Sequence, residues 1–157
     1  MEFIDLSHVK IGELLTILNE QKIRKHLIEH AYFDVASLRQ WVENKIKIDL
    51  LPGCRIRAVY INGILAGWCG IQPDDKGFEL AIVISQKFWG SGTLVFKELM
   101  RWAKELGHKE VLLHLLESRP EYRILKRVAT QVHKTELLGR SFTTYYIGVG
   151  SDAYYDV

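Results

Sequence analysis

A short glycine turn is the segment of this chain whose residue types and spacing most directly suggest chemistry. The turn is Trp89-Gly90-Ser91-Gly92-Thr93-Leu94, and it lies between an apolar segment and a segment with helical periodicity. The first N–H groups of a helix lack intrahelical partners, and the helix dipole adds partial positive charge there. Because glycine has no Cβ, a phosphate group can approach the backbone closely at Gly90 and Gly92. The turn is therefore a candidate anion site, and a purely structural tight turn is the alternative.

Two well-known phosphate motifs do not fit this turn. A P-loop requires Gly-Lys-Ser/Thr, which does not follow here. The dinucleotide-binding fingerprint requires three spaced glycines within a parallel βαβ unit. The turn must therefore be interpreted from its surroundings.

Two ionisable residues lie within apolar segments near the turn. Glu79 falls in the segment 78–85, where burial is expected to raise its pKa into the range of a general base near neutral pH. The alternative is an exposed strand start, where the carboxylate only aids solubility. His114 falls in the segment 111–116 and is a second candidate base, with a hydrogen-bonded structural histidine as its alternative.

The elements that must position these residues follow from hydrophobic periodicity and turn signals. Helices are predicted at residues 21–31, 35–48 and 120–128, and from just after Gly92 to Leu106. Another helical pattern follows Ser7 or His8, with Ile11, Leu14, Leu15 and Leu18 on its apolar face. Strands are predicted at residues 3–6, 55–61, 64–71, 78–85, 111–116, 132–137 and 142–149. Asp34 is a suitable N-cap, Gly107 is a suitable helix stop, and Asn62-Gly63 favours a type I′ hairpin. The segment 78–85 is almost continuously apolar, which predicts burial on both faces.

This order of elements predicts a mixed α/β fold. Strand–helix–strand segments beside hairpins favour one mixed sheet with helices on both faces. Residues 1–150 are expected to form a single domain, and residues 151–157 a C-terminal tail. Trp41, Trp68 and Trp102 are expected in the core, and Tyr145 or Tyr146 on the substrate side of the last strand.

Composition excludes several classes of protein. Of the 157 residues, 48% are hydrophobic and 25% charged, so wholesale disorder is excluded. A net charge of +2 argues against nucleic acid and anionic membranes as partners. Cys54 and Cys69 are isolated from each other and from histidines, so no metal site is expected. With no membrane-length apolar run, and with acidic Glu2 and Asp5 at the start, a cytoplasmic location is predicted.

The turn and its context resemble a known family. Trp89-Gly90-Ser91-Gly92-Thr93-Leu94 after a buried strand resembles motif A of the GNAT superfamily of N-acetyltransferases, Gln/Arg-x-x-Gly-x-Gly/Ala. In its branch acting on ribosomal-protein N-termini, Trp-Gly-Lys-Gly-Tyr-Ala is frequent. This alignment puts Trp89 at the Gln/Arg position, Gly92 at the central glycine and Leu94, a departure, at the final Gly/Ala. The predicted order of elements over residues 2–149 is also similar to this family.

The resemblance implies a fold and a cofactor. The sheet is expected to hold about seven mostly antiparallel strands, with 78–85 and 111–116 as a parallel pair that splays apart. Acetyl-CoA is the expected cosubstrate, lying in the cleft between these two strands, with no metal. The implied cofactor-binding residues are Ile82, Val83 and Ile84 for the pantetheine arm; Trp89, Gly90, Ser91, Gly92, Thr93, Leu94 and Val95 for the pyrophosphate; and Ser118 for the CoA arm.

The resemblance also implies an activity, which is acetyl transfer to a primary amine by direct attack in a ternary complex. Glu79 lies where several members carry a catalytic glutamate, so it is the first candidate base. The family tyrosine that protonates the leaving thiolate aligns with Leu125. Tyr122, one turn earlier, is the substitute candidate, and a packing role is its alternative. A thiolate is also a fair leaving group without an acid.

Other functions remain open at this point. Leu94 and Leu125 motivate a catalytically degenerate acyl-CoA-binding or structural protein of the same fold. The basic segment 119–127 motivates an RNA-binding module, which the near-neutral net charge opposes; a solvated helix face, or contact with CoA phosphates, would also account for it. The amine acceptor is not legible from the sequence, and neither is the oligomeric state, for which a homodimer is one alternative.

Overall fold

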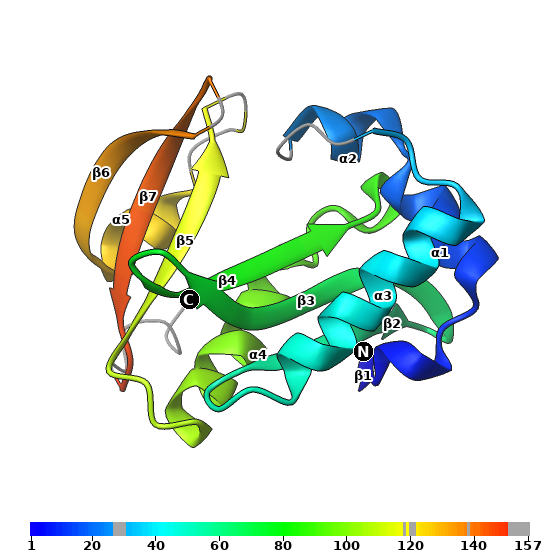
Figure 1. Ribbon diagram of the computed structural model, residues 1–157. Coiled ribbons are helices and arrows are strands. Elements are labelled where there is room, and N and C mark those ends of the chain that lie inside the picture. Colours follow the sequence, from blue (N-terminus) through cyan, green and yellow to red (C-terminus); the bar gives the residue numbers. More distant parts are fainter. Residues whose placement is uncertain (27–30, 118, 120–121, 138, 151–157) are drawn as a thin grey trace.

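One seven-stranded sheet connects most of the chain in the computed structural model, which describes residues 1–26, 31–117, 119, 122–137 and 139–150. The strand order is β1-β2-β3-β4-β5-β7-β6 (Figure 1). Only β4 and β5 are parallel among the paired strands of this sheet. The strands are β1 (Glu2–Ile4), β2 (Arg55–Ile61), β3 (Ile64–Asp74), β4 (Gly77–Ile84), β5 (Glu110–Leu116), β6 (Ala129–Leu137) and β7 (Arg140–Gly148).

Helices cover both faces of the sheet, as the sequence predicted. The helices are α1 (Ile11–Leu18), α2 (Gln21–His26), α3 (Val35–Asp49), α4 (Gly92–Glu105) and α5 (Arg123–Val128), with short 3₁₀ turns at Leu6–His8 and Gln86–Phe88. Residues of α1, α2 and α3 form one buried cluster with Trp68 and Val83. Residues of α4 and α5 form a second cluster with the opposite face of β3, β4, β5 and β7. The sheet therefore separates two cores.

Local capping and turn signals hold the elements where they were expected. Asp34 forms a capping box with Ser37, in which each side chain accepts the other residue's N–H, at 2.7 and 3.0 Å. Asn62 and Gly63 both have positive φ, at 51° and 76°, as a type I′ turn requires. Gly107 adopts a φ of +82° just after α4 and ends that helix.

Some boundaries differ from the sequence prediction. The helix predicted at 120–128 begins at Arg123, and β6 starts at Ala129, directly after that helix ends. Residues 120–121, and 27–30 of the predicted 21–31 helix, lie outside the described residues. The expectation that β4 is buried on both faces is wrong, because residues such as Glu79 and Ile82 are only half-buried. They border a cavity that is described below.

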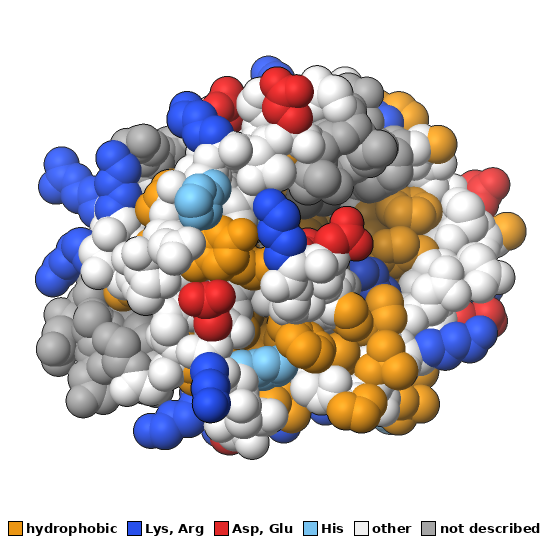
Figure 2. All heavy atoms as spheres, turned by 60° about the vertical axis from the view of Figure 1, so that its left-hand side comes forward, with side chains coloured by type: hydrophobic (Ala, Val, Ile, Leu, Met, Phe, Trp, Pro, Cys, Tyr) orange, Lys and Arg blue, Asp and Glu red, His pale blue; other side chains and the backbone are white. Residues whose placement is uncertain are grey.

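The outer surface carries mixed charge. In Figure 2, Lys and Arg side chains share one face with Asp and Glu, and hydrophobic side chains are visible between them. Within the described residues, no helix is long and apolar enough to cross a membrane.

Cys54 and Cys69 are buried free cysteines, and burial raises the pKa of the Cys69 thiol.

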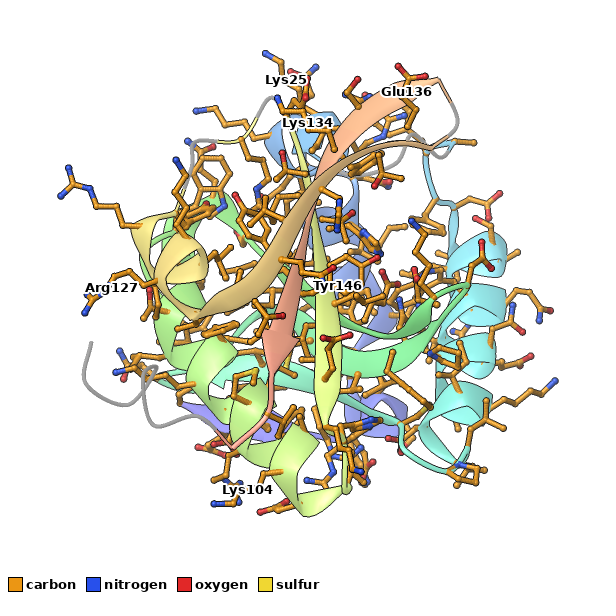
Figure 3. The ribbon with its side chains drawn as sticks, turned by 90° about the vertical axis from the view of Figure 1, so that its left-hand side faces the viewer. Lys25, Lys104, Arg127, Lys134, Glu136 and Tyr146 are labelled. Carbon is orange, nitrogen blue, oxygen red and sulfur yellow. The ribbon has the colours of Figure 1, made fainter. Side chains whose placement is uncertain are left out.

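The last strand, β7, places its two tyrosines on opposite faces. Tyr145 is buried in the α4-side core, whereas Tyr146 is half-buried and packs edge-on against His133, with ring centroids 5.4 Å apart (Figure 3). Figure 3 also shows Arg127 projecting away from the sheet on α5. The alternation of a strand separates the two rings, as expected.

The strands β3 and β4 approach each other unusually closely at Gly67. Ala66 is an unpaired bulge residue in the β2–β3 ladder, and its carbonyl accepts the Ser85 N–H at 2.7 Å. A Cβ on Gly67 would lie 1.9 Å from the Val83 carbonyl oxygen. This contact fixes the last residues of β4.

We expect Gly67→Ala to destabilise the fold by about 1–3 kcal/mol, because the backbone of β3 or β4 must shift. The matched control is Gly12→Ala, whose added Cβ meets no described atom within 4 Å. That substitution lies within α1 and should stabilise by about 0.5–1 kcal/mol. Urea unfolding of both variants measures the difference, and equal stability of the two would refute the close approach.

Candidate active site

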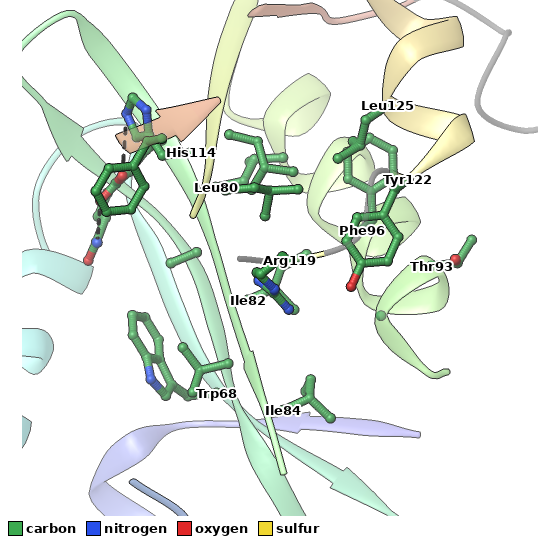
Figure 4. A pocket seen from close by; sticks show the side chains of 18 of the residues that line it. Trp68, Leu80, Ile82, Ile84, Thr93, Phe96, His114, Arg119, Tyr122 and Leu125 are labelled. Carbon is green, nitrogen blue, oxygen red and sulfur yellow. Dashed lines mark hydrogen bonds and ion pairs between the residues drawn. The ribbon is translucent and has the colours of Figure 1, made fainter. Parts of the chain in front are cut away.

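A cavity of about 690 Å³ lies at the divergence of the two parallel strands (Figure 4). Among the described residues, β4 and β5 share one register pair, Glu79 with Leu112. Beyond this pair, Leu80–Ile84 and Leu113–Leu115 form facing parts of the cavity wall. Side chains from α3 and from α4 complete the wall. The predicted splay of the parallel pair therefore opens the cavity.

Three ionisable side chains meet in the cavity wall at the start of this divergence. Asp74 ends β3, Glu79 lies on β4 and His114 lies on β5. His114 Nε2 lies 3.0 Å from Asp74 Oδ2 and 3.7 Å from Glu79 Oε2. The side chains of Asp74 and His114 are only 18% and 11% exposed. The cavity thus brings both candidate bases of the sequence analysis together and adds a second carboxylate.

The other nitrogen of His114 is also engaged. Its Nδ1 lies 2.7 Å from Oγ1 of the buried Thr144, which in turn lies 3.2 Å from Oγ1 of Thr135. An ionised carboxylate only accepts hydrogen bonds, so Nε2 donates to Asp74. In the neutral ring, Nδ1 then accepts from the Thr144 hydroxyl. These bonds fix the orientation of the imidazole.

Burial and hydrogen bonding act in opposite directions on Glu79. Burial raises the pKa of its carboxyl, while the hydrogen bond from Gln72 and the charge of His114 oppose that rise. Gln72 Nε2 donates to Glu79 Oε1 at 2.7 Å. With 24% of its side chain exposed, Glu79 lies in the cavity wall, so the exposed-start alternative is wrong. A carboxyl with a raised pKa is a stronger base once it is ionised.

Lys45 and Trp41 of α3, together with Trp68 of β3, line the cavity next to this cluster. Lys45 Nζ donates to Gln72 Oε1 at 2.6 Å and lies 5.4 and 4.7 Å from the ring centroids of Trp41 and Trp68. Burial lowers the pKa of Lys45, and the charge of Glu79 opposes that change. Trp41 is half-buried in the cavity wall rather than in the core; Trp68 is buried and also lines the cavity. Trp102 is a core residue, as expected.

The glycine turn borders the cavity at the start of α4. Gly90, Gly92 and Thr93 line the wall, and a Cβ on either glycine would meet no described atom within 4 Å. Gly90 also has a φ of +105°, a conformation that favours glycine. Among the described residues, the N-cap Ser91 makes no side-chain capping bond. The helix start is therefore open toward the cavity, as an anion site requires.

Part of the predicted pyrophosphate site is arranged differently. The N–H groups of Leu94 and Val95 donate to the Ser91 carbonyl at 3.1 and 3.2 Å, and the Ser91 N–H donates to Phe88. None of Ser91, Leu94 and Val95 lines the cavity; the Leu94 side chain is exposed and Val95 belongs to the core. Within the described part of the turn, Gly92 and Thr93 keep N–H groups without a backbone acceptor.

The β4 residues predicted to bind the pantetheine arm contact Trp89 in the cavity wall. Ile82, Val83 and Ile84 all line the cavity. The Trp89 indole donates to the Ile84 carbonyl at 3.0 Å, although its ring is about half exposed. That carbonyl is therefore already engaged, which the sequence did not indicate.

Tyr122 lies in the cavity wall rather than in the core. It is the N-cap residue of α5, its side chain is 39% exposed, and the Arg119 guanidinium lies 5.9 Å from its ring centroid. Leu125, at the family tyrosine position, is buried and also lines the cavity. The packing alternative for Tyr122 is therefore wrong. Ser118 lies outside the described residues, and neither Tyr145 nor Tyr146 lines this cavity.

Comparison with known proteins gives the family. The family model described as acetyltransferase (GNAT) family matches residues 14–124, which is more than half of the chain. The chain belongs to the acetyltransferase (GNAT) family. The predicted membership is confirmed, and so is the mixed sheet with its one parallel pair.

Solved structures with low sequence identity share this fold. One is spermidine N-acetyltransferase from Vibrio cholerae in complex with CoA and spermine, with 16% identity, 94% of this chain and 95% of that chain covered, and a TM-score of 0.70. Another is a putative acetyltransferase from Salmonella typhimurium with its cofactor acetyl-CoA (13% identity, 96% and 93% covered, TM-score 0.68). A third, also from Salmonella typhimurium, modifies the N-terminal serine of ribosomal protein L7/L12 (15% identity, 94% and 93% covered, TM-score 0.71). A search of curated protein sequences finds no match.

Three polar residues of the site escaped the sequence analysis. They are Asp74 and Gln72, which lie between the predicted strands 64–71 and 78–85, and Lys45, which lies in the predicted helix 35–48. The β3–β4 register, which pairs Gln72 directly with Glu79, brings the amide to the carboxylate. Asp74 and His114 meet although 40 positions separate them. The predicted strand 64–71 continues to Asp74 in the structure, which places Gln72 and Asp74 on the same face of β3.

The carboxylate–imidazole cluster also has the spacing of a cation site. One ligand atom each from Asp74, Glu79 and His114 lies within 4.8 Å of the others. The sequence predicted no metal, and the hydrogen bonds of His114 to Asp74 and Thr144 account for the cluster without one. We assign no ion to it.

The raised pKa of Glu79 predicts a pH-dependent change in stability. Because the folded-state pKa of Glu79 lies above its unfolded value of 4.5, the stability that this carboxyl contributes is fully present below pH 4.5. It is lost as the pH rises through the folded pKa, at about 1.4 kcal/mol per unit of elevation. Glu79→Gln removes this loss, so its stability relative to wild type should increase from pH 4.5 upward. Urea unfolding at several pH values measures the trend, with the exposed Glu43→Gln as control. A stability of Glu79→Gln that falls relative to wild type as the pH rises would contradict a raised pKa for Glu79.

Proposed function

We propose that this protein is an N-acetyltransferase that transfers the acetyl group of acetyl-CoA to a primary amine by direct attack in a ternary complex. The observation on which this proposal rests is that one cavity wall contains both an open helix start at Gly92 and a half-buried carboxylate at Glu79. The two features supply what the reaction requires, which is a phosphate cradle and a base. Related structures that contain acetyl-CoA or CoA support this choice of donor.

The cavity wall fits the parts of acetyl-CoA. The pyrophosphate would be held by the N–H groups of Gly92 and Thr93, with Gly90 allowing close approach. The pantetheine arm would follow Ile82–Ile84 along the wall of β4. Acetyl-CoA supplies an acetyl group on a thioester, and the residues of β4 direct it toward the carboxylate end of the cavity.

The chain's own residues would then handle the protons. The amine nitrogen forms a bond with the thioester carbon, the carbon–sulfur bond breaks, and Glu79 takes the proton that the amine loses. A backbone N–H of β4 would stabilise the developing oxyanion. Asp74 and Thr144 hold His114 beside Glu79. Tyr122, exposed on the wall, is the candidate donor of a proton to the leaving thiolate.

A catalytically degenerate acyl-CoA-binding protein is the second candidate. Its supporting observation is the buried Leu125 at the position of the family tyrosine. Robust CoA binding without transfer to any amine would favour it. The candidate is weakened because Tyr122 occupies the same wall and because a thiolate leaves readily at neutral pH.

Acetyl-CoA is expected to stabilise the folded protein. At about 100 times its dissociation constant, the ligand adds ~2.7 kcal/mol, which is several degrees in melting temperature. Gly92→Glu should abolish the shift, because its carboxylate would occupy the phosphate position and repel the ligand. Gly12→Glu, which adds the same charge on the exposed side of α1, should retain it. Thermal unfolding of CoA-free protein tests this, and a wild-type shift in a folded Gly92→Glu variant would place the pyrophosphate elsewhere.

For Glu79→Gln we expect turnover to fall by roughly 10²–10⁴, the range for losing a general base. Affinity for CoA should stay within a few-fold. Wild-type activity should fall as the pH drops through the raised pKa of Glu79, where the base becomes protonated. The difference in turnover between wild type and Glu79→Gln should become smaller at high pH, where more of the acceptor amine is already neutral. A pH–rate profile of both forms tests whether Glu79 is the general base. If Glu79→Gln turns over at the wild-type rate at neutral pH, the general base is His114 or a bound water instead.

A further inference from the structure

The cavity contains a half-buried ammonium group that the proposed proton transfers do not use. Lys45 reaches from α3 into the wall, where its Nζ lies 5.4 and 4.7 Å from the ring centroids of Trp41 and Trp68. No carboxylate of the described residues lies at ion-pair distance from its Nζ. Withdrawing an ammonium from water costs free energy unless a counter-charge and hydrogen bonds compensate it. Its placement therefore suggests a partner that comes from outside the chain.

The hydrogen bonding of Lys45 is incomplete. An ammonium has three N–H donors, and Gln72 Oε1 is its one hydrogen-bond acceptor among the described residues. The other two N–H donors of Lys45 have no acceptor among the described residues, and Lys45 lines the cavity. Two such N–H donors with a positive charge in the cavity wall are suited to a carboxylate, which accepts through two oxygens.

The position of Lys45 relative to the proposed base limits the size of that partner. Gln72 accepts from Lys45 with its carboxamide oxygen and donates to Glu79 with its carboxamide nitrogen, at 2.6 and 2.7 Å. The ammonium and the base are thus held at the two ends of one carboxamide. An α-amino acid carries its amine and its carboxylate on one carbon, so its two charged groups can reach both ends.

The rest of the wall suits an apolar side chain. Phe33, Trp41 and Trp68 line the same part of the cavity. The rings of Phe33 and Trp41, and those of Trp41 and Trp68, pack edge-on, with centroids 6.2 and 5.2 Å apart. Such a wall gains free energy by covering apolar surface.

We propose that Lys45 binds the carboxylate of the acceptor, which is a free α-amino acid with an apolar side chain. The inference rests on the acetyltransferase function proposed above and names its acceptor class. The amine of the amino acid then faces Glu79, while the ammonium of Lys45 disfavours polycationic acceptors. Peptide N-termini lack the adjacent carboxylate and are expected to be poor acceptors. A bound carboxylate would also oppose the effect of burial on the pKa of Lys45.

The kinetic test compares acceptors that differ only in the carboxylate. L-phenylalanine and L-leucine are each compared with their amides, with acetyl-CoA as donor. In wild type, kcat/KM should favour the acid, and Lys45→Met should reduce the acid-to-amide ratio roughly ten-fold or more, through KM. The amines of the acid and of the amide differ in basicity. This difference cancels when the acid-to-amide ratio of the variant is compared with that of wild type. Lys45→Arg should keep part of the preference, and Lys47→Met, exposed on the same helix, should keep all of it.

The binding test needs no turnover. N-acetyl-L-phenylalanine and its amide are titrated calorimetrically into wild type, free and saturated with CoA. Only the acid should bind measurably more weakly to Lys45→Met, by the same factor of roughly ten or more. Lys45→Gln, which retains a donor for Gln72 without the charge, is the second variant if Lys45→Met has a lowered melting temperature.

The outcomes separate this inference from the proposed function. Equal binding of acid and amide to wild type, or an unchanged preference in both folded variants, overturns the role of Lys45. Acetyl transfer to amines without any preference for the carboxylate overturns it as well, while the acetyltransferase function stands. Lys45-dependent binding of the acid without any transfer supports the carboxylate site and counts against the proposed reaction.

Discussion

The separation of β4 from β5 governs where the cavity, its ionisable residues and the glycine turn lie. Parallel strands normally pair along their length, yet here the described residues share one register pair, Glu79 with Leu112. Beyond that pair, the backbone groups on the β5 side of β4 face a cavity, although the opposite side of β4 pairs with β3, and buried backbone groups need partners. A ligand with its own amide groups meets that need, which links the shape of the sheet to an extended cofactor arm.

The cores on the two faces of the sheet hold this separation in place. One consists of α1, α2 and α3 against β2, β3 and β4, and the other of α4 and α5 against β3, β4, β5 and β7. The close contact of Gly67 with Val83 and the hydrogen bond from Ser85 to Ala66 tie the far end of β4 to β3. Because β4 is anchored on that side, it does not follow β5. The glycine turn then starts α4 on the open side of the cavity.

A connected set of polar groups crosses the cavity wall from α3 to β7. It runs from Lys45 through Gln72 to Glu79, and from Asp74 through His114 to Thr144. Polar groups withdrawn from water are tolerated when each finds a partner, and such networks orient their members strongly. Glu79 and His114 are thus presented in a fixed geometry to whatever enters. The spare donors of Lys45 are the exception in this set, which is why we place a ligand beside it.

From the sequence we could predict the order of elements, the hairpin at Asn62-Gly63, the cap at Asp34 and the glycine turn, because each depends on residues close together in the chain. It also indicated Glu79 and His114, since an ionisable residue in an apolar strand is conspicuous. Tertiary structure alone decided that these two residues meet, that Asp74 and Gln72 join them, and that Trp41 and Lys45 form the facing wall. It also decided which N–H groups of the turn stay open. Strand register and the divergence of β4 and β5 set these contacts, and both arise from packing between segments far apart in the sequence, which local periodicity does not encode.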